Sequence, residues 1–188
     1  MEVIYDQDLD KIDFNRTPIA AEYESCSFTN CSFSKLDLRD IVFEECSFDN
    51  CNFTNAKIKN TAFKNVKFSE CKLLGLHFTN SNPFLLELDF DNCQLDYASF
   101  YQLKLSKTNF NNCSLKEVDF VETDLNQASF TGSNLYGAIF EQANLEKANF
   151  LTSKNYNIDP DLNKMTGSQF SVLSLAGLLD KHKLDISH

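Results

Sequence analysis

Long apolar runs are missing from the sequence, and no segment approaches the ~18–20 apolar residues that a membrane-spanning helix needs. The first residues, Met-Glu-Val-Ile-Tyr-Asp, lack the basic start and the apolar core of a signal peptide. We therefore expect a cytoplasmic protein with no membrane contact.

Groups that perform catalysis are also scarce. Histidine occurs three times, and the sequence has neither a Gly-rich phosphate-binding loop nor a nucleophile motif. The sequence predicts no catalytic residues and no cofactor, and therefore a protein that is not an enzyme. Basic residues are outnumbered by acidic ones, and the net charge is −10. Because DNA, RNA and anionic lipid attract Lys and Arg, we expect no direct binding of nucleic acid and a partner that is a basic or neutral protein.

Large apolar residues recur at every fifth position through most of the chain. One series of such positions, which we call centres, comprises Tyr23, Phe28, Phe33, Leu38, Phe43, Phe48, Phe53, Ile58, Phe63, Phe68, Leu73 and Phe78. A second series comprises Phe90, Leu95, Phe100, Leu105, Phe110, Leu115, Phe120, Leu125, Phe130, Leu135, Phe140, Leu145 and Phe150. A period of five matches neither a helix nor an alternating strand. It predicts a coil with flat sides, stabilised by the stacking of turn upon turn.

All seven cysteines lie two residues before a centre, where the other residues are mostly small. They are Cys26, Cys31, Cys46, Cys51, Cys71, Cys93 and Cys113. We interpret them as reduced core side chains. Cysteines in adjacent repeats are five residues apart, not the three of a Cys-x-x-Cys knuckle, so the sequence predicts no metal site. Several pairs, such as Cys93 and Cys113, are twenty residues apart, as expected if each turn contains four repeats.

Two motifs, Ala143-Asn144-Leu145-Glu146-Lys147 and Ala148-Asn149-Phe150-Leu151-Thr152, resemble the pentapeptide-repeat family, whose consensus is Ala-(Asp/Asn)-Leu-x-x. The resemblance covers residues 21–152. It implies an all-β solenoid, namely a right-handed quadrilateral β-helix with four repeats per turn; the period of five does not by itself determine the number of sides. The centres would then fill about six turns, with Phe90, Phe110, Phe130 and Phe150 in one column and Phe100, Phe120 and Phe140 in the opposite one.

The register of the repeat breaks once, near residues 80–87, where the two series are twelve residues apart. Pro83 cannot donate a ladder hydrogen bond, which favours a loop. Two interpretations remain open. The loop could fold Phe84 or Leu86 back onto the coil, or it could contact a partner through Pro83, Phe84 and Leu85.

The two ends of the chain depart from the repeat. Residues 1–20 have apolar side chains outside the register of the centres, and we expect them to form an N-terminal cap. Residues 153–188 contain a connector followed by a short α-helix, with Ser171 as its expected N-cap. The apolar residues of this helix cover too much of its surface for one buried face. It could cap the coil alone, or it could also form a homodimer through Val172, Leu173, Leu175, Leu178 and Leu179.

Acidic residues are concentrated in the second half of the coil. Residues 87–150 contain ten acidic and four basic residues, whereas residues 25–86 are nearly neutral. On a four-sided coil, two adjacent sides and their corners carry a candidate acidic binding face formed by Asp96, Glu117, Asp119, Glu122, Asp124 and Glu141. The alternative is an ordinary solubilising surface.

The layout also resembles the quinolone-resistance (Qnr-like) members of the family, in which C-terminal helices join two rods end to end. That resemblance implies a DNA mimic that occupies the DNA-binding surface of a type II topoisomerase, DNA gyrase or topoisomerase IV. The single short register break and the nearly neutral first half depart from that subgroup. The alternative function is a structural protein–protein interaction scaffold unrelated to DNA.

Overall fold

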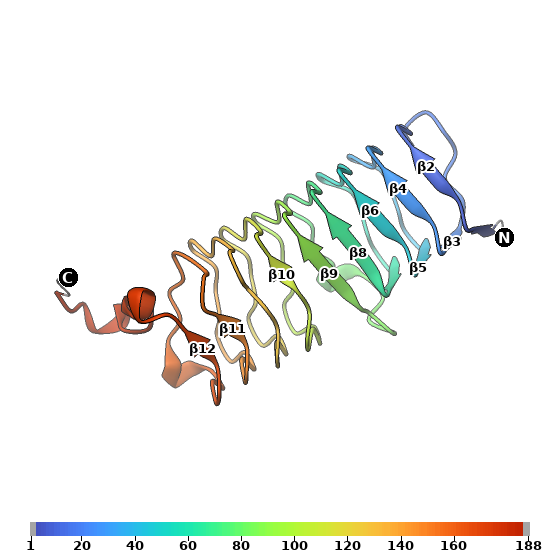
Figure 1. The fold of residues 1–188 in the computed structure, drawn as a ribbon. Helices are drawn as coiled ribbons and strands as arrows, with labels where there is room; N and C mark the ends of the chain where they lie inside the picture. The colour runs from blue at the N-terminus through green and yellow to red at the C-terminus, as the bar shows by residue number, and fades with distance from the viewer. Residues whose placement is uncertain (1–2, 186–188) are drawn as a thin grey trace.

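The computed structural model describes residues 3–185. The first two residues of the expected N-terminal cap and the last three of the C-terminal segment lie outside this range. The described chain forms a rod of stacked turns, with its two termini at opposite ends (Figure 1). The flat-sided coil predicted from the five-residue period and the all-β solenoid implied by the family resemblance are both confirmed.

Two parallel sheets run along adjacent sides of the rod. The longer sheet contains β2 (Asp8–Asp10), β4 (Ser27–Thr29), β6 (Ser47–Asp49), β8 (Val66–Ser69), β9 (Leu88–Asp91) and β10 (Phe110–Asn111). The shorter sheet contains β1 (Val3–Tyr5), β3 (Glu22–Glu24), β5 (Val42–Glu44) and β7 (Ala62–Lys64). A further parallel pair near the C-terminal end consists of β11 (Asn149–Phe150) and β12 (Gln169–Phe170). Isolated parallel bridges join the turns elsewhere.

Residues twenty apart, such as Phe28 and Phe48, are partners in adjacent turns, so each turn contains four repeats. We name each face of the rod after the first residue of the first series of centres that lies on it. The Phe28 face contains Phe28, Phe48, Phe68, Phe90, Phe110, Phe130 and Phe150, and the Phe33 face contains Phe33, Phe53, Leu73, Leu95, Leu115 and Leu135. The Leu38 face contains Leu38, Ile58, Phe78, Phe100, Phe120 and Phe140, and the Tyr23 face contains Tyr23, Phe43, Phe63, Leu105, Leu125 and Leu145.

Aromatic rings fill the axis of the rod. Along the Phe28 face, neighbouring rings stack at centroid distances of 4.7–5.5 Å. Phe100, Phe120 and Phe140 stack in the same way on the opposite face, which confirms the two predicted columns. Rings of these opposite faces meet edge to face across the axis, as Phe110 and Phe120 do at 5.5 Å and 82°. Stacked and edge-to-face rings are both favourable arrangements, and together they produce a close-packed interior.

The corners of the coil explain why polar residues occupy the remaining positions. The second residue after a centre has a left-handed backbone, with φ of 56° at Asn30 and 53° at Glu117. Asn and Gly adopt this conformation most readily, and an exposed corner also favours polar side chains. At Gly137 a Cβ atom would lie 2.9 Å from Cγ of Glu117, so the glycine leaves room for that side chain.

The N-terminal segment, expected to lie outside the repeat, forms an additional turn of the coil. Ile4 pairs in register with Tyr23, and Leu9 pairs with Phe28. The interval between these partners is 19 residues instead of 20. This one-residue shift places the segment out of phase with the centres, although its own apolar residues are five apart.

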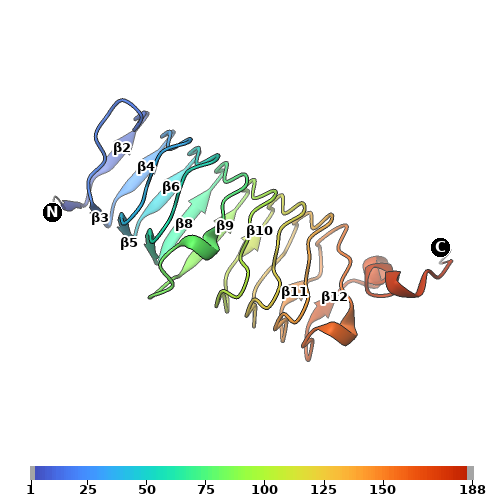
Figure 2. The ribbon, with the colours of Figure 1, turned by 180° about the vertical axis from the view of Figure 1, so that it is seen from behind.

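The register break forms η1 (Phe78–Asn80), a 3-10 helix, followed by a loop that projects from the side of the rod (Figure 2). The chain returns to the ladder at Glu87, whose backbone N–H donates to the carbonyl of Phe63 and whose carbonyl accepts from the N–H of Val66. Val66 and Leu88 are then partners across 22 residues, so the break adds two residues to a turn.

The C-terminal segment continues the coil before it becomes helical. Bridges join Asn134 to Lys154 and Asn144 to Lys164, and η2 (Pro160–Leu162) lies between them in sequence. The short helix expected next is present, but it is a 3-10 helix and not an α-helix: η3 (Val172–Leu178), followed by η4 (Asp180–His182). Ser171 caps η3 as predicted, because its hydroxyl accepts from the backbone N–H of Leu173.

Candidate functional site

The six acidic residues singled out from the sequence, which we call the acidic stripe, lie on the C-terminal half of the rod. The stripe consists of Asp96, Glu117, Asp119, Glu122, Asp124 and Glu141. Asp119 and Glu141 lie on the Leu38 face, and Glu117 and Glu122 lie at the two corners that border it. Asp96 follows a centre of the Phe33 face and Asp124 precedes a centre of the Tyr23 face, so the stripe extends over three sides and not over the two that the sequence predicts. Three of them are exposed and three are half-buried; the exposed ones are Glu117, Glu122 and Glu141.

Neutral donors orient most of the stripe. Asp119 accepts hydrogen bonds from the hydroxyl of Ser99 at 3.1 Å and from the backbone N–H of Val121 at 2.9 Å. Glu122 accepts from the side-chain amide of Gln102 at 2.8 Å. Asp96 and Asp124 accept in the same way, from groups that include Ser114 and Asn144. These bonds hold the carboxylates in place without neutralising them.

The ion pairs of the described residues lie elsewhere. They join Lys11 to Asp10, Arg16 to Asp13, Arg39 to Asp37, Lys64 to Glu44, and Lys181 to Asp159 and Asp161. Within residues 3–185, no member of the acidic stripe forms an ion pair, so no cation of the described chain offsets the charge of the stripe.

Exposed aromatic and aliphatic side chains accompany the stripe, and the sequence interpretation missed them. Tyr97 and Tyr136 are 61% and 62% exposed, Ile139 is 47% exposed, and Tyr101 donates from its hydroxyl to Glu122 at 3.4 Å. The available signal was a large side chain at an outward position of the repeat, between centres. Tyrosine beside charged groups is typical of protein–protein contact surfaces.

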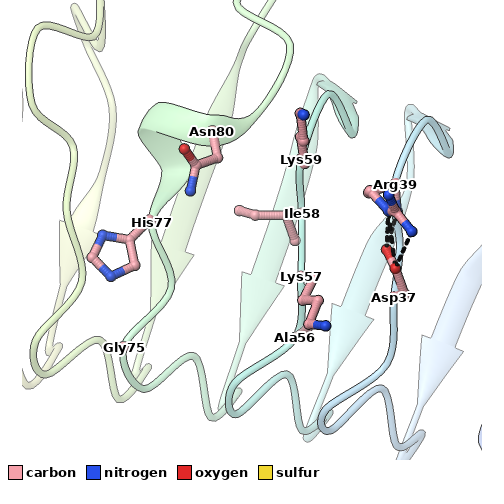
Figure 3. Close-up of a pocket in the computed structure, with 9 residues that line it drawn as sticks. All are labelled: Asp37, Arg39, Ala56, Lys57, Ile58, Lys59, Gly75, His77 and Asn80. Atoms are coloured by element: carbon pink, nitrogen blue, oxygen red, sulfur yellow. Dashed lines mark hydrogen bonds and ion pairs between the residues drawn. The ribbon is translucent and has the colours of Figure 1, made fainter.

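A shallow basic hollow lies on the N-terminal half of the Leu38 face. It has a volume of about 450 Å³, and residues that line it include Arg39, Lys57, Lys59 and His77 (Figure 3). The guanidinium of Arg39 donates to Asp37, and this hydrogen bond holds the pKa of the Asp37 carboxyl below its usual value. Lys57 lies beside Asp37 in the adjacent turn and also favours the charged form of this carboxyl, but in the part of the chain that the structure describes neither Lys57 nor Lys59 forms an ion pair. The sequence interpretation also missed this cluster.

The loop at the register break exposes apolar side chains. Phe84 is 68% exposed and Leu85 is 62% exposed, and Pro83 is exposed beside them. Leu86 is half-buried against the core. Leu86 therefore returns to the coil, as the first interpretation expects, while Phe84 and Leu85 project, and a contact of these residues with a partner stays a prediction.

The candidate dimer residues of the C-terminal segment differ in exposure. Val172 and Leu173 are 84% and 85% exposed, Leu175 and Leu179 are 39% and 38% exposed, and Leu178 packs against the core. The segment is attached to the coil because the carbonyl of Gly177 accepts from the N–H of Ile158 and the hydroxyl of Tyr156 donates to Ser174. It thus covers the end of the coil and leaves apolar side chains exposed.

The seven cysteines are free thiols, and all are buried, as predicted. The Cys51 thiol donates to the carbonyls of Phe28 and Asp49, both at 3.3 Å. Burial raises the pKa of the Cys46 thiol to about 12. Within residues 3–185, no group of three or more His, Cys, Asp or Glu is arranged to hold a metal ion, and no helix has the length and apolar character to span a membrane.

Comparison with known proteins gives a family match and several similar folds. The family described as pentapeptide repeat region matches residues 21–100 and 81–150. A trypsin-treated form of QnrB1, a plasmid-mediated fluoroquinolone resistance protein, is similar with a TM-score of 0.65 and 16% identity, over 99% of this chain and 100% of that chain. HetL, a pentapeptide repeat protein involved in heterocyst differentiation regulation from the cyanobacterium Nostoc sp. strain PCC 7120, is similar with a TM-score of 0.66 and 16% identity, over 90% of this chain and 87% of that chain. No curated protein matches the sequence. At these identities the structural likeness shows the fold alone.

Proposed function

The chain belongs to the pentapeptide-repeat family, and on that premise we propose that it is a non-enzymatic binding protein whose acidic stripe contacts a basic surface of a protein partner. The observation that carries this proposal is the unpaired charge of the stripe in the described chain. Carboxylates held by neutral donors are preorganised, so little side-chain entropy is lost when cations bind them.

The spacing of the charges favours a partner that otherwise binds DNA. From Asp96 to Glu141 the stripe spans about two and a quarter turns, or roughly 11 Å at ~4.8 Å per turn. Six charges over this length give roughly one per 2 Å of rod, close to the one per ~1.7 Å of duplex DNA. The stripe therefore imitates a short piece of duplex, about three base pairs long at ~3.4 Å per pair. We infer that the partner class to test first is the type II topoisomerases, DNA gyrase and topoisomerase IV.

The test is a gyrase supercoiling assay, with and without a fluoroquinolone, comparing the wild type with a variant whose stripe is neutralised. That variant carries Glu117→Gln, Asp119→Asn, Glu122→Gln and Glu141→Gln. We expect the wild type to change supercoiling and the variant to lose most of this effect. Binding of the wild type to gyrase should also weaken steeply with salt, as multi-charge contacts do.

A matched control removes the same charge from another part of the rod. It carries Glu45→Gln, Asp49→Asn, Glu70→Gln and Asp91→Asn, four exposed residues outside the stripe. Equal loss of activity in both variants would show that net charge and not the stripe is responsible. If gyrase does not respond to the wild type at all, the topoisomerase proposal is wrong.

The exposed loop supports a second candidate, a scaffold that holds a protein unrelated to DNA. Phe84 and Leu85 form an apolar projection on a polar rod, and such projections are common contact points. Phe84→Ser with Leu85→Asn removes it, and Asn is tolerated at residue 85 because φ there is 56°. A gyrase effect lost in this variant and kept in the stripe variant would show a shaped contact through the loop and overturn the DNA mimic, whereas a wild type without any effect on gyrase favours the scaffold.

A further inference from the structure

The Leu38 face carries opposite charges at its two ends. Its N-terminal half contains the basic hollow with Arg39, Lys57 and Lys59 (Figure 3). Its C-terminal half contains Asp119, Glu122 and Glu141 of the acidic stripe. Between the two halves, at the turns of Phe78 and Phe100, the outward side chains are His77, Thr79, Ser99, Tyr101 and the corner amides. The Leu38 face therefore has a basic N-terminal end, an acidic C-terminal end and an uncharged centre.

The outward side chains of this face form two columns parallel to the rod. The residues one before each centre are Asp37, Lys57, His77, Ser99, Asp119 and Ile139, and parallel bridges join several of them. The residues one after each centre are Arg39, Lys59, Thr79, Tyr101, Val121 and Glu141. Each turn adds ~4.8 Å, so a partner surface with the same repeat can meet the columns turn by turn.

A second copy of this chain has that repeat. In an antiparallel arrangement, the two-fold axis lies in the interface, perpendicular to the rods and midway between the turns of Phe78 and Phe100. Such an axis reverses the order of the turns and keeps each column opposite its own counterpart. Lys57 then faces Asp119 of the second copy, and Arg39 faces Glu141 of the second copy. Each of these contacts occurs twice.

We propose that two copies of this protein associate side by side through the Leu38 face, in antiparallel orientation, with Lys57 opposite Asp119 and Arg39 opposite Glu141. Charge complementarity favours a second copy of the chain as the partner. The antiparallel orientation that aligns the turns of the two copies also places basic residues of one copy opposite acidic residues of the other. Lys57 gains an ion-pair partner, which it does not have in the described chain, while Lys59 faces Val121 of the second copy. Exposed Tyr101 meets Thr79 near the axis, where no charge has to be desolvated.

The side-by-side dimer has a consequence for the proposed function, although the argument for the dimer is independent of that function. Asp119 and Glu141 belong to both surfaces, so a second copy on the Leu38 face covers part of the acidic stripe. Self-association and binding of a basic partner are then mutually exclusive.

The test uses charge reversal and sedimentation of the full chain at low and high salt. Lys57→Asp places two like-charged contacts in the dimer, and so does Asp119→Lys. Each variant alone should associate about tenfold more weakly than the wild type, because each substitution alters two symmetry-related contacts in the dimer. An equimolar mixture of the two restores both pairs and should associate as the wild type does. Association through the C-terminal segment would not respond to these charges.

Controls keep the result interpretable. Lys67→Asp makes the same charge change on the exposed side of the Phe28 face and should leave association unchanged. Since Asp119 accepts two hydrogen bonds, thermal unfolding checks the fold of its variant, and Arg39→Glu with Glu141→Arg provides an independent pair of partners. A wild type that remains monomeric at low salt and high concentration, or two single variants that do not recover on mixing, would overturn the proposal.

Discussion

The inward position two residues before each centre lies against the backbone of the preceding turn, and at Cys51 that backbone leaves room for a small side chain. Cys51 is 1% exposed, and its sulfur lies 3.3 Å from the carbonyl oxygen of Phe28 in that turn. The Ser133 hydroxyl at the equivalent position donates to the carbonyl of Phe110. These positions are therefore occupied by side chains that are apolar or that donate to a carbonyl, and the buried ones, such as Leu76 as well as Cys51 and Ser133, carry no charge.

Cys51→Asp should lower the free energy of unfolding by more than about 3 kcal/mol, because the carboxylate would be buried beside carbonyl oxygens with no cation. Cys51→Ala keeps the position small and should cost about 1–2 kcal/mol. Urea unfolding of the two variants measures the difference. Equal losses would mean that residue 51 is not enclosed as described.

The buried thiols also make the stability depend on pH. Burial raises the pKa of Cys46 to about 12, above its ordinary value of about 8.5 when unfolded. The folded protein therefore holds this proton more tightly, and the stability associated with it is complete below pH ~8.5 and declines as the pH rises towards 12. The decline should reach about 1.4 kcal/mol per pH unit for one thiol.

Cys46→Ala should flatten that decline. Unfolding by denaturant at several pH values above 8.5 measures the slope for the wild type and for the variant, and the difference isolates Cys46 from the other titrating groups. Identical slopes would show that this thiol titrates normally in the folded protein.

Whether the sequence predicts the role of a residue depends on the local environment of that residue. The centres and the cysteines were predicted because burial on a strict period leaves a visible pattern. Tyr97 and Ile139 were missed because outward positions obey no such rule, so a large side chain there changes no period. Arg39, Lys57 and Lys59 gather only after the turns stack, when residues twenty apart become neighbours.

At the scale of the single turn, stability comes from contacts with the turns above and below. Phe120 is fully buried, stacks on Phe100 at 5.3 Å and on Phe140 at 5.0 Å, and meets Phe110 and Phe130 edge to face. A turn has no core of its own, so each ring is held by residues that are distant in the chain. The same dependence explains the N-terminal turn, which a 19-residue interval conceals in the sequence and three paired strand residues reveal in the structure.

Phe120→Ala should lower the free energy of unfolding by ~3–5 kcal/mol, the usual result when a fully enclosed ring is replaced by a cavity. Tyr97→Ala serves as the control, since that ring is 61% exposed and its loss should cost less than about 1 kcal/mol. Denaturant unfolding compares the two. Similar small losses in both would contradict the ring columns.

At the scale of the whole molecule, the rod separates three surfaces: the acidic stripe, the projecting loop, and the C-terminal segment. The last covers the end of the coil, yet Val172 and Leu173 remain more than four-fifths exposed, at 84% and 85%. Adjacent apolar side chains on a terminal segment are typical of a contact between subunits. The predicted end-to-end homodimer remains a prediction.

Val172→Ser with Leu173→Ser should convert an end-to-end dimer to a monomer without unfolding the coil, because neither side chain packs on the core. Leu178→Ser is the contrasting variant, since Leu178 does pack there and its loss should destabilise the coil end. Sedimentation and thermal unfolding separate the two effects. A wild type with no C-terminal association at micromolar concentration would remove the end-to-end dimer and would leave the segment as a cap.

The four-repeat turn also relates chain length to direction. Each repeat turns the chain by a quarter of a revolution, so an insertion of five residues between the loop and the stripe would rotate the stripe by about 90° relative to the loop, while twenty residues would restore its bearing. The core would change little, since its columns accept either Phe or Leu. An insertion or deletion of one repeat in such a protein therefore changes the angle between two surfaces about the rod axis. An insertion of a whole turn changes only the distance between them along the rod.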